Sequence, residues 1–381
     1  MIELKRIHKS YKGKSVLKNI SLTIKTGEFF VLIGSSGCGK TTLLKSINRL
    51  NSIDEGDILI NEVNAKEIPG EELPRQIGYV VQEGGLFPHM TVADNIALAL
   101  KIAGEPRDQI GGRVDTMMTL VNLAPDTYRN QYPCQLSGGQ RQRVGVARAF
   151  AANPQIILMD EPFSALDPMT RAELQDEIHR LQKQFQKTIV LVTHDMDEAI
   201  KLADRICIIE NGQVAQCDCP ENILKHPANE YVERFIGKNR LWANPEYLKA
   251  SDIMLLRPYT ISKGRTVVQA VQIMRHHSID SLLVTDSRGY LLGVVRMRDI
   301  LKPKAYTEPV EAYISNDYIS VLEDTSLKKL ISTIDYEVSG ILPVVSHSGM
   351  VLGYLTKSSL LATMSKQFVP EGSEHERIGT I

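Results

Sequence analysis

Residues 34–42 read Gly-Ser-Ser-Gly-Cys-Gly-Lys-Thr-Thr and come directly after the apolar run Phe29–Ile33. The segment fits the pattern G-x-x-x-x-G-K-[ST], whose fixed positions are here Gly34, Gly39, Lys40 and Thr41. A strand that ends at Ile33, a turn of small residues and a helix that begins near Lys40 would direct several backbone N–H groups at one point. Because a helix N-terminus carries partial positive charge and unpaired donors, that point suits a polyphosphate.

The same segment supplies candidate ligands for a nucleotide and its metal ion. Lys40 would reach the β- and γ-phosphates, and the Thr41 hydroxyl would ligate Mg²⁺. An ordinary Gly-rich turn between a strand and a helix is the alternative interpretation. The candidate nucleotide-binding residues of this segment are Gly34, Ser35, Ser36, Gly37, Cys38, Gly39, Lys40, Thr41 and Thr42.

Length and composition limit the classes of protein that fit. A chain of 381 residues is long enough for two or three domains, and 43% apolar with 23% charged residues is typical of a globular protein. Lys and Arg total 44 against 45 for Asp and Glu, so no electrostatic case for nucleic-acid binding follows. No run of apolar residues is long enough to span a bilayer, so we expect a partner to hold the chain at any membrane where it acts.

The cysteines favour a reducing cytoplasm. Five is an odd number, and their positions show no disulfide framework. Cys217 and Cys219 lie one residue apart, after an expected turn at Asn211-Gly212. We expect buried or surface thiols here, because a zinc site would need two further ligands at workable spacing.

Polar side chains follow three further apolar runs. Gln82 comes after Ile77–Val81, and His194 comes after Thr188–Thr193. Asp160 and Glu161 close the run that starts at Ile156. Such compact runs suit strands buried on both faces of a parallel sheet, and open α/β sheets bind ligands at the carboxyl ends of their strands.

These polar residues have a common chemical interpretation. Gln82 could hydrogen-bond a metal-bound water, and Asp160 could hold Mg²⁺ through water. Glu161 could act as the general base toward the attacking water, and His194 could donate to a γ-phosphate. Adjacent acids are commonly a solvated loop and a single His is usually structural. Their shared placement in a chain with a phosphate-binding segment favours the catalytic interpretation. The candidates are Glu161, His194 and Gln82 for catalysis, and Thr41, Gln82 and Asp160 for the metal ion.

A second helix start has the properties of an anion site. Leu136–Gln140 precedes the helix-prone run 141–152, and the segment's candidate ligands are Ser137, Gly138, Gly139 and Gln140. Elsewhere, the pattern predicts strands over residues 1–33 with a turn at Lys12-Gly13. It predicts helices over most of 91–130, with a polar interruption at 104–112, and over 168–184. Tyr11 lies just before the first turn, where it could stack on a base or simply pack at a strand edge.

Residues 1–238 resemble the ATPase subunit of an ABC transporter, a P-loop NTPase with a RecA-like core, an antiparallel β subdomain and a helical subdomain. Tyr11 matches the family's adenine-stacking aromatic and Gln82 its Q-loop glutamine. The other matching elements occur in the expected order: Gly34–Thr42 as Walker A, Leu136–Gln140 as the signature, Ile156–Asp160 as Walker B, Glu161 as the catalytic glutamate, Ser164–Asp167 as the D-loop and His194 as the switch histidine.

This resemblance implies a head-to-tail homodimer that uses ATP and Mg²⁺. Each ATP would lie between Walker A of one copy and the signature of the other, and closure would complete the site. The segment Glu83–Met90 lies where the family docks its membrane partner. Because Glu161 and His194 are both present, the resemblance does not favour a degenerate, non-hydrolysing version.

The last third of the chain contains a repeat. Gly289 and Gly349 are 60 residues apart, as are Gly293 and Gly353, and apolar strand, turn, strand and helix recur around each pair. The repeat resembles a tandem pair of CBS modules. The predicted boundaries are a linker at 239–250, modules at 251–306 and 307–366, and a mobile tail at 367–381.

Ligand binding by the CBS pair stays open at this point. Nucleotide-binding copies in that family have a hydroxyl residue and an Asp three residues apart. The first copy has Arg296 and Asp299, and the second has Thr356 and Ser359, so each keeps half of the pattern. The alternatives are a pair that merely dimerises, a regulatory ligand such as a cyclic dinucleotide, and a response to ionic strength.

An ABC ATPase followed by two CBS modules resembles the ATP-binding subunits of importers for glycine betaine, carnitine and choline. Such a subunit would be held at the cytoplasmic face of the membrane by an integral-membrane permease, which works with a solute-binding protein or domain. Another small solute, such as ergothioneine or an amino acid, is an alternative. A nucleotide-sensing CBS protein with a vestigial ATPase is an alternative of another class. A soluble ABC ATPase working on nucleic acid usually carries two cassettes and basic insertions, which this chain lacks.

Overall fold

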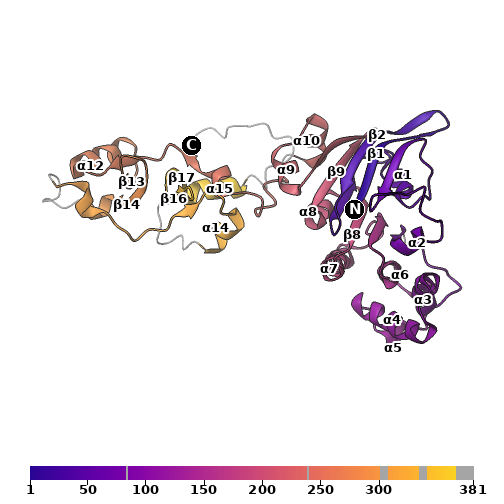
Figure 1. The fold of residues 1–381 in the computed structure, drawn as a ribbon. Coiled ribbons are helices and arrows are strands. Elements are labelled where there is room, and N and C mark those ends of the chain that lie inside the picture. The colour runs from indigo at the N-terminus through magenta and orange to yellow at the C-terminus, as the bar shows by residue number, and fades with distance from the viewer. Residues whose placement is uncertain (83–84, 238–239, 301–307, 334–340, 366–381) are drawn as a thin grey trace, which may run out of the picture. The chain divides into compact units, whose positions relative to one another are not determined.

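The computed structural model describes residues 1–82, 85–237, 240–300, 308–333 and 341–365 (Figure 1). The chain forms two compact units, Met1–Ile236 and Gly237–Ile381, which are considered separately. Glu83, residue 239 of the predicted linker, both edges of the predicted module boundary at 306/307, and the tail at 367–381 lie outside the described residues. No helix in the described part of the chain is long and apolar enough to cross a membrane.

The first unit contains a central six-stranded sheet in the order β10-β9-β3-β8-β7-β6. Five strands are parallel, and β10 pairs antiparallel with β9 at one edge. Every residue of β3, β7 and β8 is buried, which confirms the strands expected from their apolar runs. The bounds are β3 Phe29–Ile33, β6 Ile77–Val80, β7 Ile156–Asp160, β8 Thr188–Thr193, β9 Arg205–Glu210 and β10 Gln213–Asp218.

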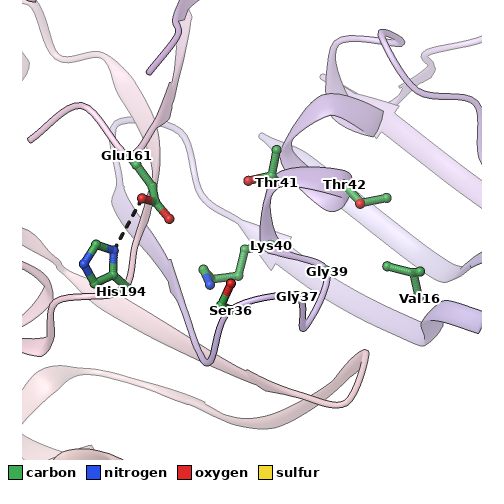
Figure 2. Close-up of a pocket in the computed structure, with 9 residues that line it drawn as sticks. All are labelled: Val16, Ser36, Gly37, Gly39, Lys40, Thr41, Thr42, Glu161 and His194. Atoms are coloured by element: carbon green, nitrogen blue, oxygen red, sulfur yellow. Dashed lines mark ion pairs between the residues drawn. The ribbon is translucent and has the colours of Figure 1, made fainter. Parts of the chain in front are cut away.

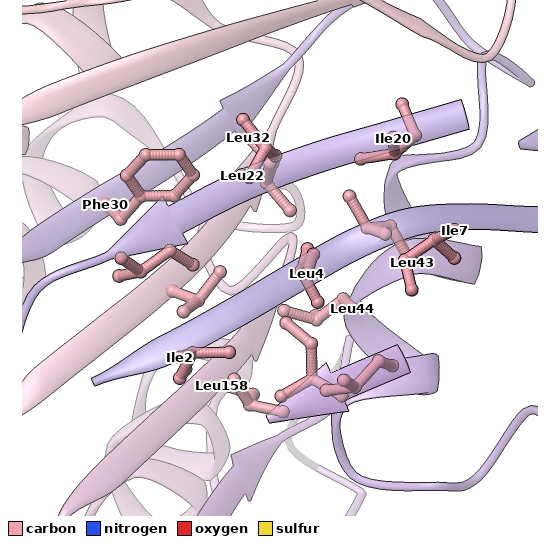
Figure 3. Packing of buried hydrophobic residues seen from close by; sticks show 14 of the residues in the cluster. Ile2, Leu4, Ile7, Ile20, Leu22, Phe30, Leu32, Leu43, Leu44 and Leu158 are labelled. Carbon is pink, nitrogen blue, oxygen red and sulfur yellow. The ribbon is translucent and has the colours of Figure 1, made fainter. Parts of the chain in front are cut away.

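A four-stranded antiparallel sheet, ordered β2-β1-β4-β5, packs beside the central one. Its strands are β1 Ile2–Tyr11, β2 Lys14–Ile24, β4 Glu55–Ile60 and β5 Val63–Asn64. Apolar side chains of both sheets and of helix α1 (Lys40–Ile47) form one buried cluster, in which Leu4, Leu32, Leu43 and Leu158 lie together (Figure 3). This core fixes α1 against the end of β3, and it therefore fixes the phosphate-binding segment between them.

The helices between β6 and β7 gather apart from β1 and β2 (Figure 1). Helix α3 packs against both α4 and α6. The predicted interruption at 104–112 is wrong beyond Pro106, because α4 begins at Arg107 and runs through Gly111 and Gly112. Buried Ile110, Val114 and Met117, spaced as on one helix face, outweigh the low helix propensity of the two glycines. The bounds are α3 Val92–Ala103, α4 Arg107–Leu120, α5 Pro125–Tyr128 and α6 Gly138–Ala151, and α2 Leu73–Gln76 comes just before β6.

Helices also follow β7, β8 and β10 in the first unit. Helix α7 occupies Pro168–Phe185, which confirms the helix expected at 168–184. Asp167 caps its start by accepting a hydrogen bond from the Thr170 amide at 3.0 Å. The remaining helices are α8 Met196–Leu202, α9 Pro220–Lys225 and α10 Glu230–Ile236.

The second unit contains two small sheets, ordered β12-β13-β14 and β11-β17-β16-β15. Strand, turn, strand and helix recur as β13, β14, α13 and as β16, β17, α15, which confirms the internal repeat. The two turns also pair, since the Leu291 amide donates to the Gly349 carbonyl at 3.2 Å and the Val351 amide to the Gly289 carbonyl at 3.1 Å. The bounds are α11 Ala250–Ile253, β11 Leu255–Leu256, β12 Thr260–Ser262, α12 Val267–His276, β13 Ser281–Thr285, β14 Leu291–Arg296, α13 Met297–Ile300, β15 Val321–Leu322, α14 Leu327–Thr333, β16 Ile341–Val345, β17 Val351–Thr356 and α15 Lys357–Ser365.

The core of each repeat includes a residue from the segment that precedes the other repeat, here called its leading segment. Leu248, which lies in the predicted linker, is buried in one cluster with Leu342 and Leu355 of the second repeat. Conversely, Val310 is buried in the cluster of the first repeat. The described part of 240–250 is therefore packed structure, and the hydrophobic cores cross the predicted boundary in both directions.

Candidate active site

The phosphate-binding segment joins β3 to α1 and wraps around a lysine. The Lys40 ammonium is buried, and it donates to the backbone carbonyls of Gly34 at 2.8 Å and Ser35 at 3.1 Å. These bonds hold the segment in a closed curve around a positive charge. Such a curve presents backbone N–H groups to an anion, as the sequence pattern predicts.

Two glycines are required by this close packing. Gly39 has φ +107°, and a Cβ there would lie 2.8 Å from Leu17 Cδ2 and 3.0 Å from the Val16 carbonyl oxygen. A Cβ on Gly34 would lie 2.3 Å from the Ile209 carbonyl oxygen. Any side chain at either position would push the segment away from β2 or β9.

A cavity of about 460 Å³ opens over the segment (Figure 2). Figure 2 shows Glu161 and His194 on one side of it, with Lys40 and Thr41 from the start of α1 on the other. The chain thus brings a cation, a hydroxyl, a carboxylate and an imidazole to one space. The lining residues are Val16, Ser36, Gly37, Gly39, Lys40, Thr41, Thr42, Glu161 and His194.

Glu161 is held in an unusual backbone conformation. Its φ is +46°, in the left-handed region that residues with a side chain rarely adopt. Its amide donates to the Val192 carbonyl at 3.0 Å, and its Oε2 lies 3.4 Å from His194 Nδ1. The tight turn after β7 places the carboxylate in the cavity, beside the imidazole. A carboxylate so held can accept a proton from a water molecule.

Asp160, one residue earlier, is 7% exposed and faces the start of α1. Thr41 Oγ1 donates to its Oδ1 at 2.8 Å, the Tyr79 hydroxyl donates to Oδ2 at 3.4 Å, and Lys45 Nζ lies 3.9 Å from Oδ2. Burial, and then the Asp160 carboxylate, raise the pKa of Tyr79, so this hydroxyl stays a proton donor. A hydroxyl and a carboxylate in contact provide the hard oxygen ligands that Mg²⁺ prefers, so these residues fit the metal ion.

Several expected residues lie away from this cavity. Among the described residues that line it, there is no member of the segment Ser137–Gln140, and neither Gln82 nor Tyr11 is present. Gln82 is exposed just past the end of β6. Tyr11 is 44% exposed at the end of the β1–β2 hairpin, with the Lys9 ammonium 5.3 Å from its ring centroid.

The segment Ser137–Gln140 begins helix α6 with a capping box. The Gln140 amide donates to Ser137 Oγ at 3.2 Å, and the Ser137 amide donates to Gln140 Oε1 at 2.9 Å. Gly139 packs closely on α7, since a Cβ there would lie 2.5 Å from Thr170 Cγ2. Gly138 has open space around it. The helix start predicted as a second anion site is therefore well capped, but within one chain it does not line the cavity over Lys40.

Sequence reasoning missed three residues of the site. Tyr79 and Lys45 contact Asp160, and Val16 lines the cavity. Lys45 could have been found, because it lies four residues after Thr41 on one helix face. Nothing in the pattern of β2 distinguishes Val16 from its apolar neighbours.

Family models match most of the chain. The ABC transporter model matches residues 17–164, and the CBS domain model matches 250–305 and 310–366. The chain is also similar to the dimeric ATP-binding cassette MJ0796 bound to ADP and Pi, with 35% identity, a TM-score of 0.53, and coverage of 58% of this chain and 99% of that one. The cbiO1 structure from Clostridium perfringens shares 27% identity with a TM-score of 0.55, over 60% of this chain and 91% of that one.

Curated relatives match over nearly their full length. The choline transport ATP-binding protein OpuBA of Bacillus subtilis is 44% identical over 95% of both chains. The glycine betaine/carnitine/choline transport ATP-binding protein OpuCA of the same organism is 45% identical, again over 95% of both. The osmoprotectant import ATP-binding protein OsmV of Salmonella typhimurium is 36% identical over 96% of both. Such extended identity, on a P-loop α/β fold followed by a repeated αβ unit, means that the chain belongs to the ABC transporter family as an ATP-hydrolysing subunit with a CBS pair.

Proposed function

We propose that this chain binds and hydrolyses ATP to drive an importer of quaternary ammonium solutes. The observation that carries the solute class is the match over 95% of each chain to proteins named for choline and for glycine betaine, carnitine and choline transport. These solutes share a permanently charged ammonium group. The chain itself would never contact the solute, so the solute class rests on these relatives alone.

The site residues have defined roles in this proposal. Lys40 and the backbone N–H groups of residues 34–42 hold the phosphates, and Glu161 accepts the proton of the attacking water. His194 orients the Glu161 carboxylate across their 3.4 Å contact. The Thr41 hydroxyl and Asp160 would hold Mg²⁺, which when bound offsets the charge of the phosphate oxygens.

A second copy of the chain completes each site in this proposal. The capping box at Ser137 presents a helix start, but within one chain this start does not line the cavity over Lys40. A head-to-tail dimer would bring Ser137, Gly138, Gly139 and Gln140 of one copy to the phosphates held by the other. Tyr11 would stack on adenine and Gln82 would reach the metal-bound water after closure. The dimeric structure of the similar ATP-binding cassette MJ0796 supports this assembly.

We further propose that the permease docks in a second cavity, of about 320 Å³. Its walls come from β6, α3 and α6. The lining includes the aromatic Phe87 and the aliphatic Ile102, and both side chains are exposed. Exposed apolar side chains around a groove suit a partner helix. Docking there would hold the chain at the cytoplasmic face of the membrane.

Regulation by the CBS pair is the last part of the proposal. In the second repeat the Thr356 and Ser359 hydroxyls cap α15, since each accepts a hydrogen bond from the other residue's amide, at 2.9 and 3.0 Å. In the first repeat Arg296 donates to the Asp317 carbonyl at 2.7 Å. Because these two hydroxyls and this guanidinium already have hydrogen-bond partners, a mononucleotide in each repeat would have to displace those bonds. We therefore favour a ligand shared between the repeats, such as a cyclic dinucleotide, or a response to ionic strength.

The proposal is tested with the chain and its natural permease in liposomes. We expect ATP-dependent uptake of choline, glycine betaine or carnitine, and none of ergothioneine or amino acids. Glu161→Gln should keep ATP binding, slow hydrolysis at least about a hundredfold and trap an ATP-bound dimer. Uptake of another solute alone would refute the solute class. A wild-type complex without hydrolysis would favour the nucleotide-sensing alternative.

A further inference from the structure

A third cavity, of about 590 Å³, lies away from the nucleotide site in the first unit. It is lined by residues of β1, β2, β4, β9 and β10. Two of the lining residues are Arg205 at the start of β9 and Cys217 on β10. Neither residue has a role in ATP hydrolysis as described above. A half-buried thiol beside a guanidinium is the arrangement found at reactive cysteines.

Cys217 also has a second thiol directly opposite. In the antiparallel pairing of β9 with β10, Cys217 is in register with Cys207, and both are free thiols. Directly opposite residues of an antiparallel pair have Cα atoms about 4.5–5.5 Å apart, and a disulfide accepts about 4.4–6.8 Å. The two thiols are close enough for each to shift the pKa of the other. A disulfide between them would therefore need little movement of the backbone.

The surroundings divide the two thiols into distinct roles. Arg205 Nη2 donates to Cys217 Sγ at 3.2 Å. The Cys207 thiol and then the nearby Arg205 charge lower the pKa of Cys217, although burial acts in the opposite direction. The Cys217 sulfur and burial raise the pKa of Cys207, which has no exposed surface. Cys217 is thus the thiol that can react with a molecule in the cavity, and Cys207 is the buried thiol next to it.

We propose that Cys217 and Cys207 form a thiol–disulfide exchange site for the disulfide of a small thiol that enters this cavity. The Cys217 thiolate attacks one sulfur of the small disulfide, which forms a mixed disulfide and releases one small thiolate. The Cys207 sulfur then attacks Cys217 Sγ, giving the Cys207–Cys217 disulfide and releasing the second small thiol with the proton from Cys207. Counted from the Cys217 thiolate, the protein loses two electrons and one proton, and the small disulfide gains them to become one thiolate and one thiol.

The site is one strand away from the phosphate-binding segment. Cys207 is in register with Leu32 of β3, and two residues later the Ile209 carbonyl oxygen packs against Gly34. Because the Ile209 carbonyl oxygen is this close to Gly34, even the small shift of β9 toward β10 that a disulfide needs would disturb the packing. We expect the oxidised protein to bind ATP more weakly, with affinity restored by dithiothreitol.

The experiment treats the full-length protein with 2-hydroxyethyl disulfide and follows each cysteine by peptide mass spectrometry. In wild type we expect a Cys207–Cys217 disulfide. In Cys207→Ala we expect a stable mixed disulfide on Cys217, and in Cys217→Ala no reaction at Cys207. Cys134→Ala and Cys219→Ala are the matched controls and should still form the disulfide. Circular dichroism melts show whether each variant is folded.

The contribution of Arg205 is measured by the rate of the first step. Arg205→Met should lower the fraction of Cys217 that is thiolate, and the greater nucleophilicity of a more basic sulfur offsets part of that loss, so the rate should fall about threefold. A disulfide between Cys207 and Cys38, a first reaction at Cys219, or an unreactive Cys217 in folded wild type would overturn the proposal. An oxidised protein with unchanged ATP affinity would overturn the link to the phosphate-binding segment.

Discussion

Glu161 occupies the left-handed region of backbone conformation although it has a side chain, with φ +46°. Such a conformation costs about 1–3 kcal/mol and persists only where the surroundings enforce it. Here the backbone contacts are the bond from its amide to the Val192 carbonyl and the bond that its carbonyl accepts from the Ser164 hydroxyl at 3.1 Å. Part of the folding free energy therefore offsets this strain, which holds the Glu161 carboxylate in the cavity.

The backbone at Gly39 gives a prediction for the same site. In Gly39→Ala a methyl group at φ +107° would also meet Leu17 and Val16 within 3.0 Å. In the matched control Gly13→Ala, at φ +82°, a Cβ would have no neighbour within 4 Å. In both variants the left-handed backbone conformation destabilises the residue with a side chain. Overpacking should lower the free energy of unfolding of Gly39→Ala by about 1–3 kcal/mol more than that of Gly13→Ala. Thermal denaturation measures the stability, and nucleotide titration should show lost affinity for Gly39→Ala alone. Equal stability of the two variants would contradict this.

At the residue scale the sequence predicted chemical identities but not conformations. The phosphate-binding pattern predicted Lys40 and Thr41, and Asp160 and Glu161 were predicted, from the end of the apolar run before them, as polar groups at the same sheet edge. It could not indicate that Tyr79 would reach Asp160, since that contact depends on the pairing of β6 with β7. The roles assigned to Gln82 and Tyr11 stay predictions that depend on a closed dimer.

Among the elements, the loop before α3 depends on one buried amide. Asn95 is fully buried, and its Nδ2 donates to the carbonyls of Phe87 at 3.2 Å, Met90 at 3.1 Å and Thr91 at 3.0 Å. Its Oδ1 accepts from the Phe87 amide at 2.8 Å. One side chain therefore holds the loop that carries Phe87 into the proposed permease groove.

We predict that Asn95→Ala uncouples the chain from its permease. Loss of these buried hydrogen bonds should destabilise the first unit by about 1–3 kcal/mol and loosen the loop. ATP affinity should stay near wild type, since Asn95 does not line the nucleotide cavity, while permease-stimulated hydrolysis and solute uptake fall. Lys101→Ala, at an exposed position of the same helix, serves as the control. Full uptake by a destabilised Asn95→Ala protein would exclude this role for the loop.

The exchanged segments of the CBS pair give a second element-level prediction. Leu248 is 1% exposed and lies in the core of the second repeat, whereas Leu256 is 70% exposed. Leu248→Ala should lower the free energy of unfolding of the second unit by about 2–5 kcal/mol, and Leu256→Ala should change it little. Chemical denaturation followed by the fluorescence of Trp242, which packs against the same cluster, measures both. Similar effects of the two variants would mean that the segment is not part of this core.

Sequence patterns predicted elements well where burial is complete. The runs at β3, β7 and β8 are apolar throughout because both of their faces are covered. The pattern failed at Gly111 and Gly112, where packing overrides propensity. The pattern also predicted a linker at 239–250. The packing partners of this segment lie about 80 to 110 residues further along the chain, as Leu342 and Leu355 do for Leu248, so no local pattern reveals them.

At the scale of the whole molecule, the chain divides between Ile236 and Gly237 into two compact units. The residues that line the nucleotide cavity all belong to the first unit. The recurring turns with Gly289 and Gly349 belong to the second. The proposed catalysis and the proposed regulation thus belong to units with separate cores.

We predict that truncation after Gly237 keeps catalysis and removes regulation. The shortened chain should bind its permease and hydrolyse ATP at a rate within about twofold of the full chain in the absence of any regulator. The response of hydrolysis to added salt or to a cyclic dinucleotide should disappear. Activity of truncated and full-length complexes, measured side by side over a salt series, provides the check. A retained response would place the sensor in the first unit.

The exchange of leading segments between the repeats has a consequence during synthesis on the ribosome. Leu248 leaves the exit tunnel long before Leu355, its partner in the core, has been translated. Until then the nascent chain exposes an apolar segment that nothing covers, which is a target for chaperones. A message cut short within the second repeat should therefore yield a product that aggregates, even though its ATPase unit has already folded.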